Sequence, residues 1–310
     1  MGQPRWKRAA FRSFDRFVPT VPYRFLPPRQ TVRTTYEVIL DREPEAAALD
    51  HFERALHQGR ISRHGLAESL IHSEEARRSV PITDVLLSMH VSRCEFVRGL
   101  PRASRIIDLG GTHQGYPDGA LVHLGYPYRF DRLLVVDLPP GERHAIYQGG
   151  GGGGSVQSPL GPVEFAFHSM AELARYPDSS FDLVYSGQSI EHVPQAEGET
   201  VLGEAHRILV PGGWLCVDTP NGPVWRVRSD ALMNPDHRIE YSSDQLASAV
   251  ERAGFEIREH KGLNYMGEAL AQGRFDEVEA SANPGVFASP DECLLLALVA
   301  RKPMIEPPRI

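Results

Sequence analysis

A glycine-rich turn follows an apolar segment that carries a carboxylate. Asp108 belongs to the apolar run 105–109, and the turn 110–115 comes directly after it. Such a turn lets the backbone approach a ligand closely at the carboxyl edge of a parallel sheet. Position 112 is threonine, whose side chain obstructs the close approach of a pyrophosphate that a dinucleotide-binding turn requires. The turn therefore predicts a nucleoside-like ligand without phosphates.

A second carboxylate, Asp137, ends the next apolar segment, 133–137. An acidic residue at this position of a nucleoside-binding α/β fold accepts hydrogen bonds from ribose hydroxyls. The pairing with Asp108 strengthens the prediction of a nucleoside site, although Asp137 alone is also compatible with a simple turn residue.

Three further segments follow in a fixed order. They are an aspartate-containing predicted strand within 177–186, the run Ile190-Glu191-His192-Val193, and a Pro-Gly-Gly turn at 211–213. Together with the first turn, they resemble the class I S-adenosylmethionine-dependent methyltransferase family over about residues 84–301. The resemblance implies a Rossmann-like α/β fold with a doubly wound, seven-stranded, mostly parallel sheet, and S-adenosylmethionine as the cofactor.

The same resemblance assigns the cofactor contacts. It places the methionine portion near the first turn, the ribose near Asp137 and the adenine near Ser169. The implied cofactor-binding residues are Asp108, Gly110, Gly111, Gln114, Gly115, Asp137, Leu138, Ser169, Met170 and Gln188. Gln114 stands where the family commonly has a third glycine, and Ser169 where an aspartate usually recognises adenine. Recognition of the adenine and of the cofactor carboxylate therefore stays open.

Methyl transfer to an oxygen is helped by a base, because an alcohol is a poor nucleophile until its proton leaves. His192 follows the predicted strand 181–185, and an imidazole with a pKa of about 6.5 suits this role at neutral pH. Asp218 ends the neighbouring strand and is expected to orient the imidazole. This pair resembles the arrangement in sugar O-methyltransferases, and the alternative is a His192 that only packs. Glu191 completes the candidate catalytic set, as a cofactor or loop-anchoring residue.

The polar segment 234–238 lies where class I methyltransferases usually place acceptor-binding elements. The residues expected to bind the acceptor are Asn234, His237 and Tyr241. Asp218 and Asp236 are candidate oxygen ligands for a divalent cation such as Mg²⁺, with a solvated loop as the alternative.

Apolar segments alternate with helical ones beyond residue 81, which predicts a mostly parallel sheet covered on both faces. The predicted strands are 105–109, 133–137, 163–168, 181–185, 214–218, 255–259 and 293–300. A helix is expected near 84–97, another over 200–209, and a third after a capping box formed by Ser242 and Gln245.

The N-terminal part differs from the rest of the chain in composition and in predicted secondary structure. Residues 1–30 are basic and rich in proline, which predicts an extended arm. The stretch 36–44 and the helical periodicity after it resemble the DUF4214 family of small helical modules, often found in bacterial surface-glycan and glycosylation proteins. The predicted domains are therefore the arm at 1–30, the helical module at 31–80 and the methyltransferase domain at 81–310. The glycine run 149–154 is either a flexible loop over a ligand or a passive insertion.

The net charge of -7 argues against broad affinity for nucleic acid or anionic lipid. The three cysteines show neither a disulfide framework nor metal-ligand spacing. No apolar run is long enough for a transmembrane helix, and the first residues lack the centre of a signal peptide, so a cytoplasmic location is expected. A homodimer is a candidate assembly.

These features predict O-methylation of a carbohydrate hydroxyl on a sugar, glycoside or oligosaccharide. The carbohydrate step rests on the helical module and the His–Asp pair, and the mycobacterial methylmannose polysaccharide methyltransferases are a specific candidate subfamily. One alternative is a small-molecule methyltransferase acting on a phenol, carboxylate or amine. Another is a non-catalytic binding or scaffold protein, against which the intact Asp108, Asp137 and His192 argue.

Overall fold

The computed structural model describes residues 26–40, 42–71, 74–112, 117–143 and 154–304. The chain divides into two compact units, Met1–Leu87 and Ser88–Ile310. The division falls within α5 (Glu74–Arg98), a helix that begins earlier than predicted and continues through Pro81.

In the described part of the first unit there are three more helices: α2 (Pro28–Leu40), α3 (Ala46–His57) and α4 (Arg63–Ile71). They share a small buried cluster made of Val32, Tyr36, Leu49, Leu66, Ala67 and Leu70. The prediction of an extended arm up to residue 30 is wrong for its last three residues, because α2 already begins at Pro28. A proline fits the first turn of a helix, where its missing N–H has no partner to lose. The rest of the arm, 1–25, lies outside the described residues.

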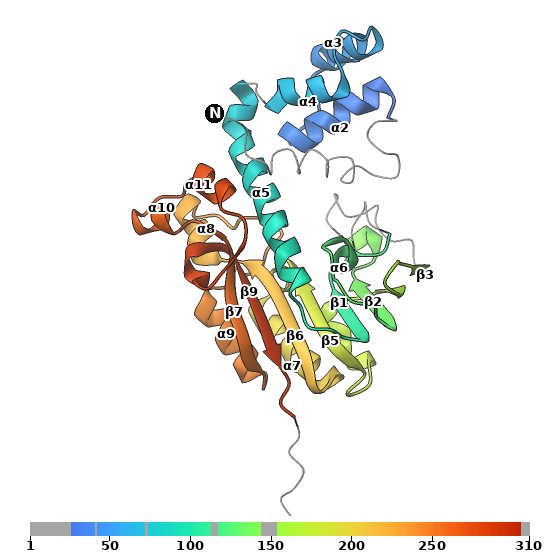
Figure 1. Ribbon diagram of the computed structural model, residues 1–310, viewed down its shortest axis with the longest axis vertical. Helices are drawn as coiled ribbons and strands as arrows, with labels where there is room; N and C mark the ends of the chain where they lie inside the picture. Colours follow the sequence, from blue (N-terminus) through green and yellow to red (C-terminus); the bar gives the residue numbers. More distant parts are fainter. Residues whose placement is uncertain (1–25, 41, 72–73, 113–116, 144–153, 305–310) are drawn as a thin grey trace, which may run out of the picture. The chain divides into compact units, whose positions relative to one another are not determined.

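The second unit is built on one nine-stranded sheet in the order β3-β4-β2-β1-β5-β6-β9-β7-β8. The strands are β1 (Arg105–Leu109), β2 (Arg132–Asp137), β3 (Gly154–Gln157), β4 (Pro162–Phe167), β5 (Phe181–Gly187), β6 (Leu209–Pro220), β7 (Glu256–Tyr265), β8 (Val286–Phe287) and β9 (Cys293–Arg301). Neighbours from β4 to β6 pair in parallel, whereas β9 runs antiparallel to both β6 and β7. The predicted doubly wound α/β fold is confirmed (Figure 1).

All seven predicted strands are present, and the short strands β3 and β8 were missed. They lie at the two edges of the sheet, where β3 follows the glycine run and β8 has only two residues. A segment of two residues, or one of four mostly polar residues such as β3, carries too little alternation to signal a strand. β6 also begins earlier than predicted, so the Pro-Gly-Gly turn lies within it, with Gly212 at φ +80°.

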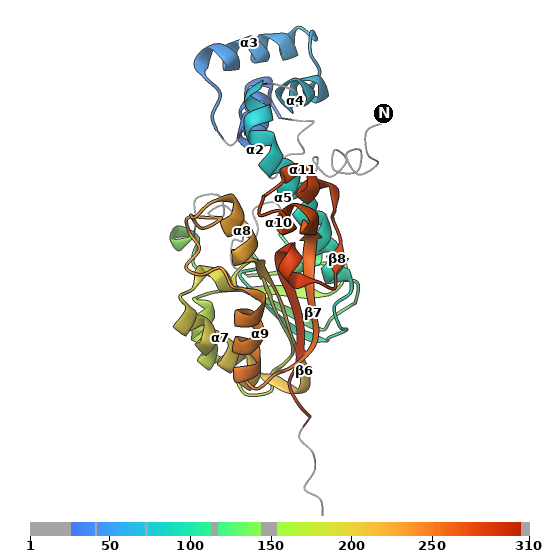
Figure 2. The same cartoon turned by 90° about the vertical axis from the view of Figure 1, so that its left-hand side faces the viewer.

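Helices cover both faces of this sheet. The remaining ones are α6 (Ala120–His123), α7 (Gln195–Ile208), α8 (Gly222–Arg228), α9 (Ser243–Arg252), α10 (Gly267–Ala271) and α11 (Glu277–Ala282). Single 3-10 turns span Pro140–Glu142, Ile190–His192 and Pro290–Glu292, and a longer 3-10 segment with a kink at Glu172 spans Met170–Arg175. α7 and α9 lie together on one face, and residues 88–98 of α5 lie on the other (Figure 2). The predicted capping box is confirmed: Gln245 N–H donates to Ser242 Oγ over 3.2 Å, and Ser242 N–H donates to Gln245 Oε1 over 2.9 Å.

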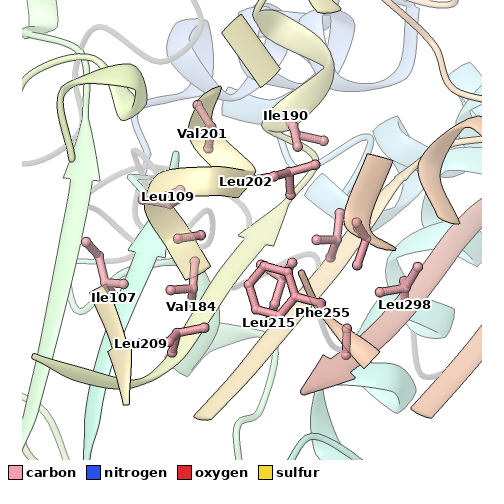
Figure 3. Packing of buried hydrophobic residues seen from close by; sticks show 14 of the residues in the cluster. Ile107, Leu109, Val184, Ile190, Val201, Leu202, Leu209, Leu215, Phe255 and Leu298 are labelled. Carbon is pink, nitrogen blue, oxygen red and sulfur yellow. The ribbon is translucent and has the colours of Figure 1, made fainter. Parts of the chain in front are cut away.

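The main core lies between the sheet and the α7–α9 layer (Figure 3). It includes Ile107, Val184, Leu215 and Leu298 from the strands, Val201, Leu202, Ala205 and Ile208 from α7, and Leu246 and Val250 from α9. Burying these residues in a continuous layer supplies most of the free energy that holds the sheet rigid. Among the described residues, no helix is both long and apolar enough to cross a membrane.

The sheet has its topological switch point between β1 and β5. From β1 the chain proceeds through β2 to β4 on one side, and from β5 to β6 on the other. Loops that leave the carboxyl ends of two such diverging strands leave a crevice between them, which is where open α/β sheets bind ligands.

Candidate functional site

A cavity of about 640 Å³ opens at the carboxyl ends of β1, β2, β4 and β5, within the ~300–1,000 Å³ range of small-molecule pockets. Of the predicted cofactor-binding residues, those that line it are Gly110, Asp137, Leu138, Ser169, Met170 and Gln188. His192, Asn234 and Asp236 line it as well. The first turn, the end of β2 and the segments after β4 and β5 thus meet at one cavity, whereas the Pro-Gly-Gly turn at 211–213 does not line it. Gln114 and Gly115 lie outside the described residues.

The turn after β1 requires glycine at two consecutive positions. Gly110 has φ +77°, a left-handed conformation that favours glycine, and its N–H donates to Val136 O over 2.7 Å. A Cβ atom on Gly111 would lie 2.0 Å from Asp108 Oδ2. Glycine at these positions therefore lets the turn pack directly on Asp108, and of the two glycines Gly110 lines the cavity.

Asp108 lies beneath the turn and does not line the cavity. Its side chain is buried, and Leu121 N–H donates to Oδ2 over 3.3 Å. Burial raises the pKa of Asp108 to about 7, and the carboxylates of Asp137 and Asp218 act in the same direction. Asp108 therefore supports the turn and α6, and its contact with a cofactor stays a prediction.

The pKa of Asp108 predicts a specific pH dependence of stability. A carboxyl group whose pKa is raised on folding contributes stability that is fully present below its unfolded pKa, about 3.9, and is lost as the pH rises through about 7. Asp108→Asn cannot ionise, so its free energy of unfolding should improve relative to wild type between pH 5 and pH 8. Urea unfolding of ligand-free protein measures this, with the exposed Asp230→Asn as control. A difference that stays constant with pH would contradict the assignment.

Asp137 is held at the end of β2 by backbone donors. Leu138 N–H donates to Oδ1 over 2.7 Å, and Thr112 N–H to Oδ2 over 3.2 Å. Arg143 Nε lies 3.6 Å from Oδ1 and donates to Leu138 O over 2.6 Å. A carboxylate offers about four acceptor positions, so Asp137 retains capacity for ligand hydroxyls. This geometry fits a ribose.

Asp218 does not pair with His192, so the predicted His–Asp pair is wrong. Its carboxylate is fully buried and accepts from Arg93 Nε over 2.6 Å, from Tyr185 Oη over 2.5 Å and from Gln188 Nε2 over 3.0 Å. Burial of Arg93 disfavours the charged guanidinium, yet the neighbouring Asp218 carboxylate holds the pKa of Arg93 above its usual value. Asp218 is thus committed to this buried network, which also makes it a poor metal ligand.

His192 instead lies against His237. The two ring centroids are 4.9 Å apart in an edge-to-face arrangement, and the His192 ring also hydrogen-bonds the backbone carbonyl of Asp236. Burial lowers the pKa of His192, and the neighbouring His237 lowers it further. His237, predicted to touch the acceptor, is buried behind His192 and is not part of the cavity lining.

Glu191 and Glu240 complete this cluster. Glu191 is fully buried, Thr219 Oγ1 donates to its Oε2 over 2.9 Å, and burial raises its pKa to about 7. Glu240 Oε1 lies 2.7 Å from His237 Nδ1. Burial opposes ionisation of Glu240, yet the hydrogen bonds from His237 and Met233 N–H keep its pKa below the usual value.

Tyr241 lies away from the cavity, which corrects its predicted acceptor-binding role. The side chain belongs to the main core, and its backbone carbonyl accepts from Gly222 N–H over 2.9 Å. The chain turns inward at this point, immediately before the capping box of α9. Tyr241 follows a polar segment in the sequence, but its side chain is part of the core.

Sequence reasoning missed several charged residues of the lining. They are Arg93, Glu142, Arg143, Glu197 and Arg238. Arg93 comes from α5, far from any motif, so no local signal identifies it. Arg238 belongs to the polar segment 234–238, whose composition pointed to the site without singling out this residue.

Two family profiles match the chain. A profile described as a methyltransferase domain matches residues 86–260, and the profile of the domain of unknown function DUF4214 matches residues 27–80. The first covers more than half of the chain. The second agrees with the predicted helical module.

Individual proteins show the same similarity over shorter stretches. A Mycolicibacterium smegmatis protein named "Probable S-adenosylmethionine-dependent methyltransferase" is 34% identical over 142 residues, covering 44% of this chain and 54% of the relative. Sterol 24-C-methyltransferase of Gibberella zeae is 34% identical over 97 residues, 28% of this chain and 25% of the relative. The chain thus spans about half, or less, of the length of these relatives. A methyltransferase structure from Thermotoga maritima shows 19% identity and a TM-score of 0.46, with 73% of this chain and 97% of that chain covered.

Proposed function

The chain belongs to the methyltransferase domain family, and on this premise we propose that it transfers a methyl group from S-adenosylmethionine to a hydroxyl of a carbohydrate acceptor. When bound, S-adenosylmethionine supplies an electrophilic methyl group on a positively charged sulfur. The residues of this chain bind and orient the two substrates and prepare the acceptor hydroxyl.

The cofactor half of the cavity follows β1, β2 and β4. The Gly110–Gly111 backbone gives room for close approach, and Asp137 offers acceptor positions to the ribose. Arg93 also lines the cavity, and although Asp218 neutralises its charge, its remaining N–H donors suit a carboxylate. These features support binding of a nucleoside that carries an amino-acid portion.

The class of acceptor is inferred from the polarity of the second half of the cavity, the part that lies beyond β5. Beyond β5 the cavity is lined by two apolar residues, Val193 and Pro194, and by five polar or charged ones: His192, Glu197, Asn234, Asp236 and Arg238. An apolar acceptor would leave these groups desolvated without partners, which costs free energy. A polyhydroxylated acceptor can pair with them, so the lining favours a carbohydrate over a sterol-like molecule.

Asp137→Ala should weaken binding of S-adenosylhomocysteine by about 1.5–3 kcal/mol, roughly 10- to 100-fold in Kd, because the ribose hydroxyls lose a charged acceptor. Isothermal titration calorimetry measures the affinity. Asp131→Ala, which removes an exposed carboxylate just before the opposite end of β2, serves as the control and should bind like wild type. An unchanged Kd in Asp137→Ala would contradict the ribose assignment.

The acceptor class is tested with labelled S-adenosylmethionine. Monosaccharides, methyl glycosides and oligosaccharides are compared with phenols, amines and sterols in one panel. Label in a carbohydrate supports the proposal. Transfer confined to the other acceptors would contradict the carbohydrate while leaving the methyltransferase activity intact.

A further inference from the structure

Three side chains of metal-ligand type meet beside the acceptor half of the cavity. Glu191, His192 and His237 each offer one ligand atom, and these atoms lie within 4.8 Å of one another. Two atoms bound tetrahedrally to one ion, each about 2.0–2.2 Å from it, lie about 3.3–3.6 Å apart, so the three side chains need only small rotations to share an ion. The backbone carbonyl of Glu191 accepts from Arg238 N–H over 2.8 Å and Ile239 N–H over 3.2 Å, which joins the two segments that carry the cluster.

Each of the three side chains is oriented by a further hydrogen bond. His237 Nδ1 is held by the buried Glu240, which leaves Nε2 for a ligand. The His192 ring is fixed by the carbonyl of Asp236, and Glu191 Oε2 by Thr219 Oγ1. A carboxylate or backbone carbonyl behind a histidine is the usual support of metal-binding imidazoles in proteins.

One oxygen of this cluster lacks a hydrogen-bond donor. Glu191 Oε1 is buried and has no partner among the described residues. A buried carboxylate oxygen without a partner is costly, because desolvation is not compensated. A cation bound between Glu191 and the two imidazoles supplies the missing interaction, so this oxygen is an observation independent of the clustering.

We propose that Glu191, His192 and His237 bind one transition-metal dication, with Zn²⁺ or Mn²⁺ as representatives. Two imidazoles and one carboxylate form a ligand set typical of such ions, whereas Mg²⁺ prefers oxygen ligands. The site differs from the expected one at Asp218 and Asp236, because both oxygens of Asp218 are already engaged by Arg93, Tyr185 and Gln188.

The metal explains how the acceptor hydroxyl is prepared, a step that rests on the proposed function. His192 lines the cavity, so an ion held by it can reach the acceptor. Three protein ligands leave coordination positions open, and a bound dication lowers the pKa of a hydroxyl in contact with it. The proton then leaves the acceptor more readily than it would from a free alcohol.

Metal binding by the full-length protein tests the site directly. Protein stripped with a chelator is titrated with Zn²⁺, and Co²⁺ provides an optical spectrum that reports its ligands. We expect one tight equivalent in wild type and a Kd about 10- to 100-fold weaker in Glu240→Gln, with at least this loss in His237→Ala and Glu191→Gln. His206→Ala is the matched control, because His206 packs on Phe255, with the two ring centroids 5.0 Å apart, and does not line the cavity. Wild type that binds Zn²⁺ no more tightly than His237→Ala would overturn the proposal.

Folding is checked by circular dichroism, and His237→Gln replaces any variant that fails to fold. The Zn²⁺-dependent rise in Tm gives a second readout, since an ion that binds the folded state raises it only where the site is intact. A rise of equal size in wild type and His237→Gln would also overturn the site.

The proposed metal site and the proposed function can be contradicted by different measurements. S-adenosylhomocysteine affinity, measured on the stripped protein, should be unchanged, whereas methyl transfer should fall and return with Zn²⁺ or Mn²⁺. Tight metal binding without transfer to any carbohydrate contradicts the acceptor class and leaves the metal site standing. Undiminished transfer in the stripped protein contradicts the metal role and leaves the His192 imidazole as the direct proton acceptor.

Discussion

Replacing Asp218 by asparagine should lower the free energy of unfolding by about 3–5 kcal/mol. The variant keeps the shape of the side chain but leaves the Arg93 guanidinium without its counter-charge. Arg93 Nε lies 2.6 Å from a carboxylate that is fully buried, so little solvent is available to replace the lost interaction. Removal of one member of a buried pair is costly for this reason, even where the intact pair itself adds little stability.

Urea unfolding measures the loss, which should appear as a lower midpoint with an unchanged m-value. Asp178→Asn is the matched control, because the Asp178 side chain is 77% exposed in its ion pair with Arg207 and should cost less than about 1 kcal/mol. The double variant Arg93→Met/Asp218→Asn should lose less than the sum of the two single changes. A loss in Asp218→Asn that matches the control would show that the buried pair does not hold this end of the sheet together.

Changing His192 to alanine should lower kcat by about 10²–10⁴-fold, the usual range for a group that activates a proton-bearing nucleophile. Affinity for S-adenosylhomocysteine should stay at the wild-type value, because the cofactor half of the cavity follows β1, β2 and β4 rather than β5. The loss is expected whether His192 takes the proton itself or holds a metal that weakens the O–H bond.

Steady-state kinetics with saturating cofactor and acceptor measures this loss, and His206→Ala again provides the histidine control. Near-wild-type kcat in His192→Ala would mean that transfer needs only proximity of the two substrates. The carbohydrate acceptor found in the labelling panel is the substrate for this measurement.

Local patterns in the sequence were sufficient for most of the sheet. β1 was predicted with its observed bounds, and the capping box of Ser242 and Gln245 was predicted with both its hydrogen bonds. A buried parallel strand appears as a continuous apolar run, and a helix cap depends on residues three positions apart, so both leave a local signal. The Gly110–Gly111 turn and Asp137 could be placed at one cavity for the same reason, because the carboxyl ends of adjacent parallel strands meet at one edge.

Which polar side chains pair with one another at the site was decided by the tertiary structure alone. Asp218 pairs with Arg93, 125 positions earlier in the chain, although His192 is much nearer in sequence. His192 instead meets His237, and Tyr241, only four residues further along, is buried in the core. The position of a residue at the end of a strand specifies which edge of the sheet its side chain lies at. It does not specify which neighbouring side chain it contacts there. That contact depends on the helix α5 and the segment 234–238 packing over the strand ends, and on which buried charge must be neutralised there.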